Sequence, residues 1–263
     1  LSTLDQAQVK VAQYDFDSDE RFNFHFIPKE RNGLAFRAMN PAQQAAALEL
    51  MSSCLSQLGM ERVRSIRDTE LVLRSMENAA PDYRNPDKYF VTIFGTPSKD
   101  KRWAWRFEGH HLSFNFTVVD GKHVFFTPSF MGTNPAEVRS GPRRGERVLG
   151  EEEDAGFAFI ESLDAEQRRA AVIAADPLKE IVTTNSKRVD PLSPAGIPAT
   201  RLNPDQRTRL EALVKLYLAR WRPELAEETF GKIAAAGLDK LTFAWAGPVD
   251  RTKGRYYRIQ GPT

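Results

Sequence analysis

Cysteine is scarce in this chain. Only one of its 263 residues, Cys54, is a cysteine, which excludes an intrachain disulfide and a cysteine-based metal site. Cys54 lies among leucines and a methionine at helical spacing, and this pattern favours a buried, unreactive thiol over a nucleophile.

Long apolar runs and a strong net charge are also missing. No apolar run approaches the roughly 20 residues that cross a bilayer, so no membrane span is predicted. Thirty-seven basic and thirty-five acidic residues give a net charge of +2, which does not indicate a nucleic-acid partner. The Walker loop, the GxGxxG turn and the GxSxG elbow are absent, which disfavours NTP hydrolysis, dinucleotide chemistry and serine-hydrolase chemistry.

Helix-start signals occur twice in the same order. An Asp or Asn that can cap free backbone N–H groups begins a predicted helix at four positions, which are Asp5, Asn40, Asp164 and Asn203. After the second cap of each pair come two predicted helices and then a strand region. The helices are expected at 41–58 and 61–78, with Gly59 ending the former, and at 204–221 and 224–236.

The strand regions of the two halves match at a constant spacing. The matching pairs are Gly95 with Gly247, Arg106 with Arg258, and Gly109 with Gly261. We therefore predict an α+β fold of two related halves, each with helices followed by an antiparallel β-meander, related by a pseudo-twofold duplication.

The predicted domains are an N-terminal half at 1–131, a linker and loop at 132–162, and a C-terminal half at 163–263. A second stretch rich in proline, glycine and charge, 176–201, is predicted to be a linker or lid. The second half stops at Thr263, which matches the middle of the strand region in the first half. This comparison predicts a longer biological polypeptide with a further tail.

Two of the four histidines, His110 and His111, are adjacent in an apparent strand. The apolar residues occupy odd positions before Gly109 and even positions after it. Since side chains alternate along a strand, this change of phase predicts a β-bulge or a sharp bend at 109–111. Such a bulge would turn both imidazoles to one side.

A metal site is one interpretation of these histidines. Two imidazoles and a third ligand, His25 or Glu108, could hold Zn²⁺, Fe²⁺ or Cu²⁺. The metal would activate water or bind oxygen, and Glu108 would act as general base. The alternative is structural, with hydrogen-bonded histidines and Glu108 paired with an arginine.

Four further residues are candidate substrate contacts. Arg31 and Arg37 flank a glycine turn, and the planar guanidinium group suits a carboxylate or a phosphate. Arg106 and Asn115 lie in the strands around the histidine pair. The alternatives are a solvated loop for the first two residues and a role in the fold for Arg106, which Arg258 matches.

Four segments carry a resemblance to a known family. Residues 105–113 (WRFEGHHLS), 115–119 (NFTVV), 132–138 (GTNPAEV) and 256–263 (YYRIQGPT) resemble the bacterial and fungal family catalogued as domain of unknown function 3500. The resemblance implies no particular activity. It implies a continuation beyond Thr263 with a His-x-His element, and a periplasmic or secreted location.

Two functions therefore remain open. The first is a metal-dependent enzyme, hydrolytic or oxidative, that acts on a small or peptidic anionic substrate. The second is a non-catalytic protein that binds a small molecule or a peptide. The sequence leaves the oligomeric state undetermined.

Overall fold

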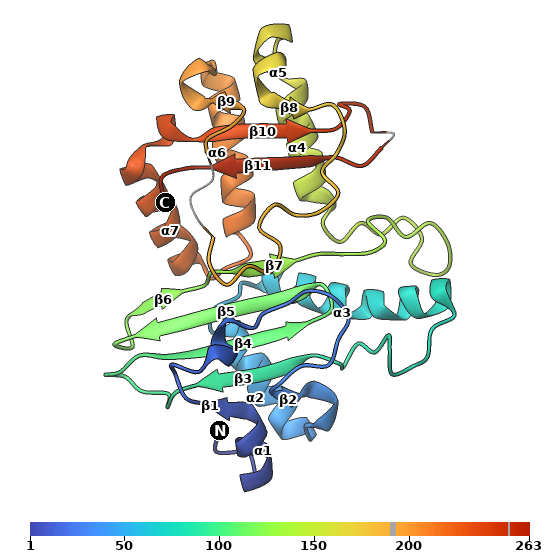
Figure 1. The fold of residues 1–263 in the computed structure, drawn as a ribbon, viewed down its shortest axis with the longest axis vertical. Coiled ribbons are helices and arrows are strands. Elements are labelled where there is room, and N and C mark those ends of the chain that lie inside the picture. The colour runs from blue at the N-terminus through green and yellow to red at the C-terminus, as the bar shows by residue number, and fades with distance from the viewer. Residues whose placement is uncertain (190–192, 252) are drawn as a thin grey trace. The chain divides into compact units, whose positions relative to one another are not determined.

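The computed structural model describes the whole chain except residues 190–192 and 252. It is a mixed α+β structure in which the described residues form seven α-helices and two sheets (Figure 1). The chain divides into two compact units, 1–149 and 150–263. Part of the linker predicted at 176–201 falls on residues 190–192 and so lies outside the described residues.

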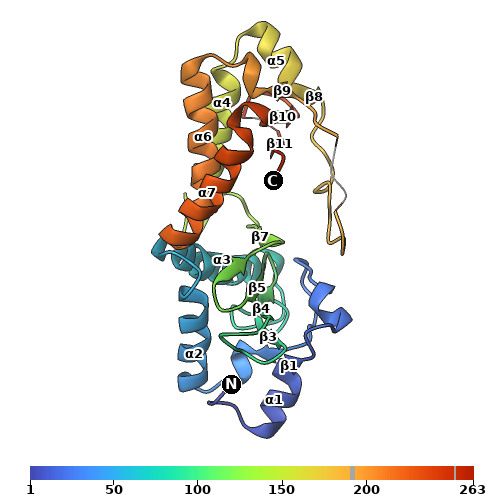
Figure 2. The ribbon, with the colours of Figure 1, turned by 90° about the vertical axis from the view of Figure 1, so that its left-hand side faces the viewer.

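The first unit combines three helices with a seven-stranded sheet. Its helices are α1 (Gln6–Ala12), α2 (Pro41–Ser52) and α3 (Gln57–Glu77). Its strands are β1 (Gln13–Tyr14), β2 (Leu34–Ala35), β3 (Phe90–Phe94), β4 (Trp103–Gly109), β5 (Leu112–Val119), β6 (His123–Phe125) and β7 (Ser129–Met131). Figure 2 shows α2 on one side of this sheet and the segment that precedes β2 on the other.

The second unit contains four helices and a smaller sheet. Its helices are α4 (Gly150–Glu161), α5 (Ala165–Ala171), α6 (Pro204–Leu218) and α7 (Pro223–Gly237). Its strands are β8 (Val172–Ala174), β9 (Ile197–Pro198), β10 (Thr242–Ala246) and β11 (Tyr256–Gln260). The core is aromatic, with Phe157, Phe159, Phe243 and Trp245 all buried.

The four predicted helix starts are confirmed. Each cap side chain accepts a hydrogen bond from the backbone N–H of a glutamine three residues later, and that glutamine side chain returns a bond to the cap. The glutamines also pair across helices. The Gln43 amide donates to Gln8 at 2.7 Å, and the Gln206 amide donates to Gln167 at 2.8 Å.

Two sequence-based expectations about helices need correction. Gly59 does not end α2, which stops at Ser52; it lies inside α3, where its backbone N–H bonds to the cap residue Ser56. The region predicted as linker and loop, 132–162, contains α4. The acidic residues in the first turn of α4 suit the positive end of the helix dipole.

The sheets are not simple antiparallel meanders. In the first unit β1 pairs with β3 in parallel, since the chain returns to the sheet through α2 and α3. In the second unit β8 pairs with β10 in parallel, with α6 and α7 in the connection. The predicted antiparallel pattern therefore holds for β3 to β6 and for β10 with β11, but not for β1 and β8, which pair in parallel.

The two units share one order of pairing. In each unit a central strand pairs with a short parallel strand, a short antiparallel strand and a longer antiparallel strand. In the first unit the central strand is β3, and these partners are β1, β2 and β4 in that order. In the second unit the central strand is β10, and the partners are β8, β9 and β11. The first unit extends its sheet beyond β4 with β5, β6 and β7. In the described part of the second unit, the sheet ends at β11.

A glycine before the short antiparallel strand is required in each unit. Gly33 has φ +106° and Gly196 has φ +91°. A Cβ atom on Gly196 would lie 2.0 Å from the carbonyl oxygen of Phe243 in β10. Only glycine can therefore let the chain approach the central strand this closely.

We expect Gly196→Ala to lower the free energy of unfolding by on the order of 3 kcal/mol, because the new Cβ must displace β10 and occupies a strained backbone conformation. The matched control is Gly231→Ala in α7, where a Cβ meets nothing within 4 Å. This variant should gain roughly 0.5–1 kcal/mol from helix propensity. Chemical denaturation measures both changes, and equal stability of the two variants would contradict the assignment.

Candidate functional site

The histidine pair forms the turn of a hairpin. Gly109 at the end of β4 pairs with Leu112 at the start of β5, and His110 and His111 lie between them. Of the two predicted alternatives, the β-bulge is therefore wrong, and the chain bends sharply in a tight turn. A two-residue turn pairs odd-numbered residues with even-numbered ones, for example Phe107 with Phe114, and this produces the change of phase seen in the sequence.

Gly109 allows a close contact beneath this turn. The fully buried ring of Tyr89 stacks on Phe107 with 5.7 Å between ring centroids. A Cβ atom on Gly109 would lie 2.3 Å from the Tyr89 ring. The Tyr89 hydroxyl donates a hydrogen bond of 2.8 Å to the carbonyl oxygen of His110. The turn is thus held by a tyrosine that only glycine can accommodate.

The backbone of His111 connects the turn to two other segments. His111 has φ +60°, a left-handed conformation that histidine adopts more readily than most residues. Its N–H donates to the carbonyl oxygen of Phe26 at 2.9 Å, and its carbonyl oxygen accepts from the N–H of Gly132 at 2.8 Å. The turn therefore joins the segment around His25 to the segment after β7.

The two imidazole rings lie on the same side of the turn. The rings of His110 and His111 stack with 3.8 Å between centroids and 30° between planes. Burial lowers the pKa of His111 to about 3, and the charges of His110 and Arg84 act in the same direction. His111 is therefore neutral at physiological pH.

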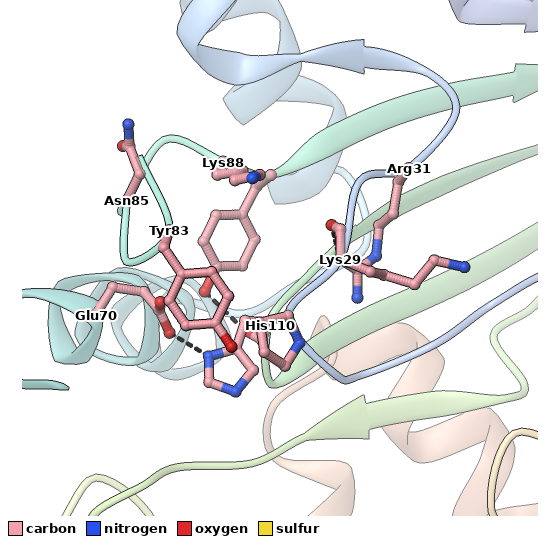
Figure 3. A pocket seen from close by; sticks show the side chains of 9 residues that line it. Lys29, Arg31, Glu70, Tyr83, Asn85, Lys88 and His110 are labelled. Atoms are coloured by element: carbon pink, nitrogen blue, oxygen red, sulfur yellow. Dashed lines mark hydrogen bonds and ion pairs between the residues drawn. The ribbon is translucent and has the colours of Figure 1, made fainter. Parts of the chain in front are cut away.

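Glu70 of α3 orients the imidazole of His110 (Figure 3). One carboxylate oxygen of the buried Glu70 contacts Nδ1 of His110 in a short hydrogen bond. Because a carboxylate only accepts, this contact requires a proton on Nδ1. Nε2 is then the basic nitrogen, and no group in the described part of the chain forms a hydrogen bond with it.

Arg84 supplies positive charge beside this pair. Its Nη1 lies 3.1 Å from Nδ1 of His110, but a guanidinium only donates and so cannot bond to a protonated Nδ1. The same nitrogen lies 3.9 Å from Glu70. Two hydrogen bonds of 2.8 and 2.9 Å fix Arg84 to Glu77. The Arg84 guanidinium therefore places a positive charge beside the contact between Glu70 and His110.

His110 and Glu70 line a small cavity of about 40 Å³. Three cations are among the other lining residues, which are Pro28, Lys29, Arg31, Tyr83, Asn85, Lys88 and Tyr89. Lys88 forms ion pairs with Glu30 and Asp82. Lys29 forms no ion pair in the parts of the chain that the structure describes. Figure 3 shows its side chain directed away from His110.

A second cavity, of about 200 Å³, shares Lys29 and Arg31 with the first. It is more polar, and its other lining residues are Glu20, Asn23, His25, Glu30, Asn32 and Glu108. Nδ1 of His25 accepts a hydrogen bond of 3.0 Å from the backbone N–H of Phe26. Burial lowers the pKa of His25, and Lys29 and Arg31 lower it further, so His25 favours its neutral form.

Arg31 organises the loop between these cavities. Its guanidinium donates to the carbonyl oxygens of Lys29, His25, Ile27 and Gly109, at 2.7 to 3.1 Å. Its Nε lies 3.4 Å from Glu108. The two terminal nitrogens of Arg31 thus donate to the protein itself, and its predicted contact with substrate stays a prediction.

Glu108 is a buried carboxylate between two arginines. It is 1 % exposed, and it lies 2.8 Å from Nε of Arg106 as well as near Arg31. The backbone N–H of His25 donates to it at 3.2 Å. Burial raises the pKa of Glu108, while Arg106 and Arg31 lower it. This is the pairing of the structural alternative, and the role of general base stays a prediction.

The remaining predicted contacts lie elsewhere. Arg106 is fully buried, and it donates to the carbonyl oxygen of Glu20 at 2.7 Å and pairs with the Glu20 carboxylate. Arg37 pairs with Asp82. Asn115 donates to the carbonyl oxygen of Pro128 at 2.9 Å. The structure thus groups His25, Arg31 and Glu108 around one cavity and leaves Arg37 and Asn115 outside both.

The metal interpretation finds no complete ligand set. Within the described residues, no group of three or more histidine, cysteine, aspartate and glutamate side chains is arranged to hold a metal ion. His110 and His111 are together, and His25 and Glu108 line the neighbouring cavity. The metal roles of these histidines stay predictions.

Glu70 is the residue that sequence reasoning missed. It lies on the buried face of α3 with Val63, Ile66 and Leu73. A carboxylate in an apolar helical stripe is unusual, because burying a charge is costly unless it has a partner. This signal is readable in the sequence, although it does not reveal that the partner is His110.

Comparison with known proteins places the chain in a family. A family model described as a protein of unknown function, DUF3500, matches residues 1–263, the whole chain. The chain belongs to the DUF3500 family. No curated protein and no solved structure matches this DUF3500 protein. Among the described residues, no helix combines the length and apolar character needed to cross a membrane.

We expect Glu108→Gln to lower the free energy of unfolding by about 3–5 kcal/mol, since it leaves two buried arginines without their shared carboxylate. Arg102→Gln is the matched control, because its ion pair with Asp17 is exposed. The control should change stability by no more than about 0.5 kcal/mol. Denaturant titration of both variants measures the difference. If the Glu108→Gln protein is as stable as the control, the ion pairs of Glu108 with Arg31 and Arg106 do not hold the site together.

Proposed function

We propose that this DUF3500 protein binds a small anionic ligand across the two cavities that share Lys29 and Arg31, and that His110 exchanges a proton with it. The observation that carries the proposal is the contact between Glu70 and Nδ1 of His110. A carboxylate that fixes the tautomer of a histidine leaves Nε2 as a base of defined direction. Such an imidazole beside a cavity suits acid–base chemistry.

The charges around the cavities favour an acidic group at the end of the ligand that lies away from His110. Lys88 and Arg31 are already paired with carboxylates, while Lys29 carries an unpaired ammonium group in the part of the chain described. The cavity at His110 has room for little more than one water-sized group. We infer that a polar atom of the ligand enters beside His110 while its acidic group lies toward Lys29.

Binding tests this proposal directly. Titration calorimetry with inorganic phosphate and a panel of small mono- and dicarboxylates should identify at least one ligand of the wild-type protein. Lys29→Gln should weaken the binding of that ligand about tenfold, which is the equivalent of one lost charge-assisted contact. Lys101→Gln, which changes an exposed lysine, should bind as the wild type does. Equal affinities for the two variants would exclude Lys29 as the anion contact.

The same ligand distinguishes an enzyme from a binding protein. If His110 is an acid–base catalyst, the wild type converts the ligand, and His110→Asn lowers the rate by about 10²-fold or more with little change in affinity. If the protein only binds, the wild type yields no product and the substitution changes affinity alone. Product analysis by mass spectrometry separates these outcomes.

In a second form of the proposal, the protein is a metal-dependent enzyme that carries out a hydrolytic or an oxidative reaction. A carboxylate on one nitrogen of a histidine is the usual support for a metal on the other nitrogen. His110 with Glu70 has this arrangement, and the ring of His111 lies against it. Zn²⁺, Fe²⁺ or Cu²⁺ would then bind Nε2 of His110, with His111 and His25 as the other proposed ligands.

Metal analysis of freshly purified protein tests this form. We expect about one transition-metal ion per chain, and a lower content in His110→Asn, because each lost ligand weakens the site. His123→Asn is the matched control, since it replaces an exposed histidine of β6. The absence of a stoichiometric metal would remove the metal-dependent form and leave acid–base chemistry by His110 alone.

We also propose that the two units are related by duplication. The shared order of strand pairing supports this relation, as do the two glutamine pairs and the matching glycines Gly33 and Gly196. Under this proposal His110 and His111 are additions to the common framework. Their counterparts at the end of the second unit are Pro262 and Thr263.

A further inference from the structure

The second unit carries a groove that the proposed site does not use. Its volume is about 360 Å³, within the range of ligand-binding sites. Most of its walls are apolar, and they come from α6, α7, the residue before β10, β11 and the residues after β11. The side chains that form them include Val214, Tyr217, Ile233, Leu241, Tyr257 and Ile259.

One border of this groove is the edge of a sheet. In the described part of the chain β11 pairs only with β10. Residues from Tyr257 to Ile259 line the groove, so the groove follows the strand. An edge strand presents backbone N–H and C=O groups that can pair with another extended segment.

The first unit shows what covers the corresponding edge there. Its strand β4 lies between β3 and β5. From β5, Leu112, Phe114 and Phe116 are buried on the side of the sheet where Phe107 stacks on Tyr89. All residues of β4 after Trp103 are buried, whereas every residue of β11 is half-exposed. One difference between the two strands is β5, which covers the edge of β4.

Charge distinguishes the two edges as well. Arg106 of β4 pairs with Glu20 and Glu108. Arg258, at the matching position of β11, also has a buried Nε, but no ion pair of Arg258 occurs within the described residues. Gln260 stands where β4 has Glu108. The second unit therefore has a cation on this strand without its carboxylate.

We propose that the edge of β11 and its groove accept a β-strand from a partner polypeptide. The segment pairs antiparallel with β11, as β5 pairs with β4. Its alternate apolar side chains enter the groove toward α6 and α7, and an acidic side chain on its other face pairs with Arg258. Strand addition of this kind takes affinity from backbone bonds and selectivity from the alternating side chains.

A short peptide tests the proposal on the full 263-residue chain. The probe is the sequence of β5 with aspartate at the position that faces the arginine, Leu-Ser-Phe-Asp-Phe-Thr-Val-Val, with a fluorescent label. The comparison peptide has lysine in place of aspartate. We expect the aspartate peptide to bind at least about tenfold more tightly, since like charges replace an ion pair. A third peptide, N-methylated along the edge that faces β11, should not bind.

Substitutions in the protein locate the binding. Arg258→Gln should remove the preference for aspartate over lysine, while Arg209→Gln on the exposed face of α6 should retain it. Ile233→Glu places a charge in the apolar wall and should weaken both peptides. Circular dichroism checks that each variant keeps its fold.

Three results would overturn the proposal. The first is that the peptides bind equally well whatever their charge or methylation. The second is that none of them binds. Alternatively, ultracentrifugation shows a dimer that Ile233→Glu dissociates and the aspartate peptide does not, in which case a second copy of the chain occupies the edge. Because no measurement here involves His110, failure leaves the proposed acid–base site untouched.

Discussion

A single buried carboxylate holds the first unit's site together. Glu108 lies between the guanidinium groups of Arg106 and Arg31, which come from the same strand and from the loop before β2. Arg31 in turn binds four backbone carbonyl oxygens, including that of Gly109 beside the histidine turn. Since two charges face one carboxylate away from water, the loop and the sheet cannot separate without exposing an uncompensated ion. Both cavities depend on this arrangement.

The local part of the fold could be predicted from the sequence. Caps at Asp5, Asn40, Asp164 and Asn203 depend only on the residues within one turn of each helix, so they were readable. The parallel strands β1 and β8 were not, because each has at most three residues and pairs across two helices. The hairpin was misinterpreted since His-His is not a typical turn sequence. A bulge and a two-residue turn also produce the same change of phase.

In the candidate site, too, local sequence features were predicted and contacts between distant residues were not. Sequence reasoning found His110 because paired histidines are conspicuous in a chain with four. It did not find Glu70, which lies 40 positions earlier on another element and meets the histidine only in the folded unit. It placed Arg31 and Arg106 as substrate contacts because an arginine looks the same in sequence whether its donors meet a ligand or the protein's own carbonyl oxygens.

In three of the bonds that fasten the tip of the β4–β5 hairpin, the turn itself contributes only backbone atoms. The hydroxyl of Tyr89 and the amide of Gly132 bind carbonyl oxygens of the turn, and the amide of His111 binds that of Phe26. None of these three bonds uses an imidazole. A change of either histidine side chain therefore leaves these three bonds in place, so the position of the turn and the chemistry of its side chains are set by separate interactions.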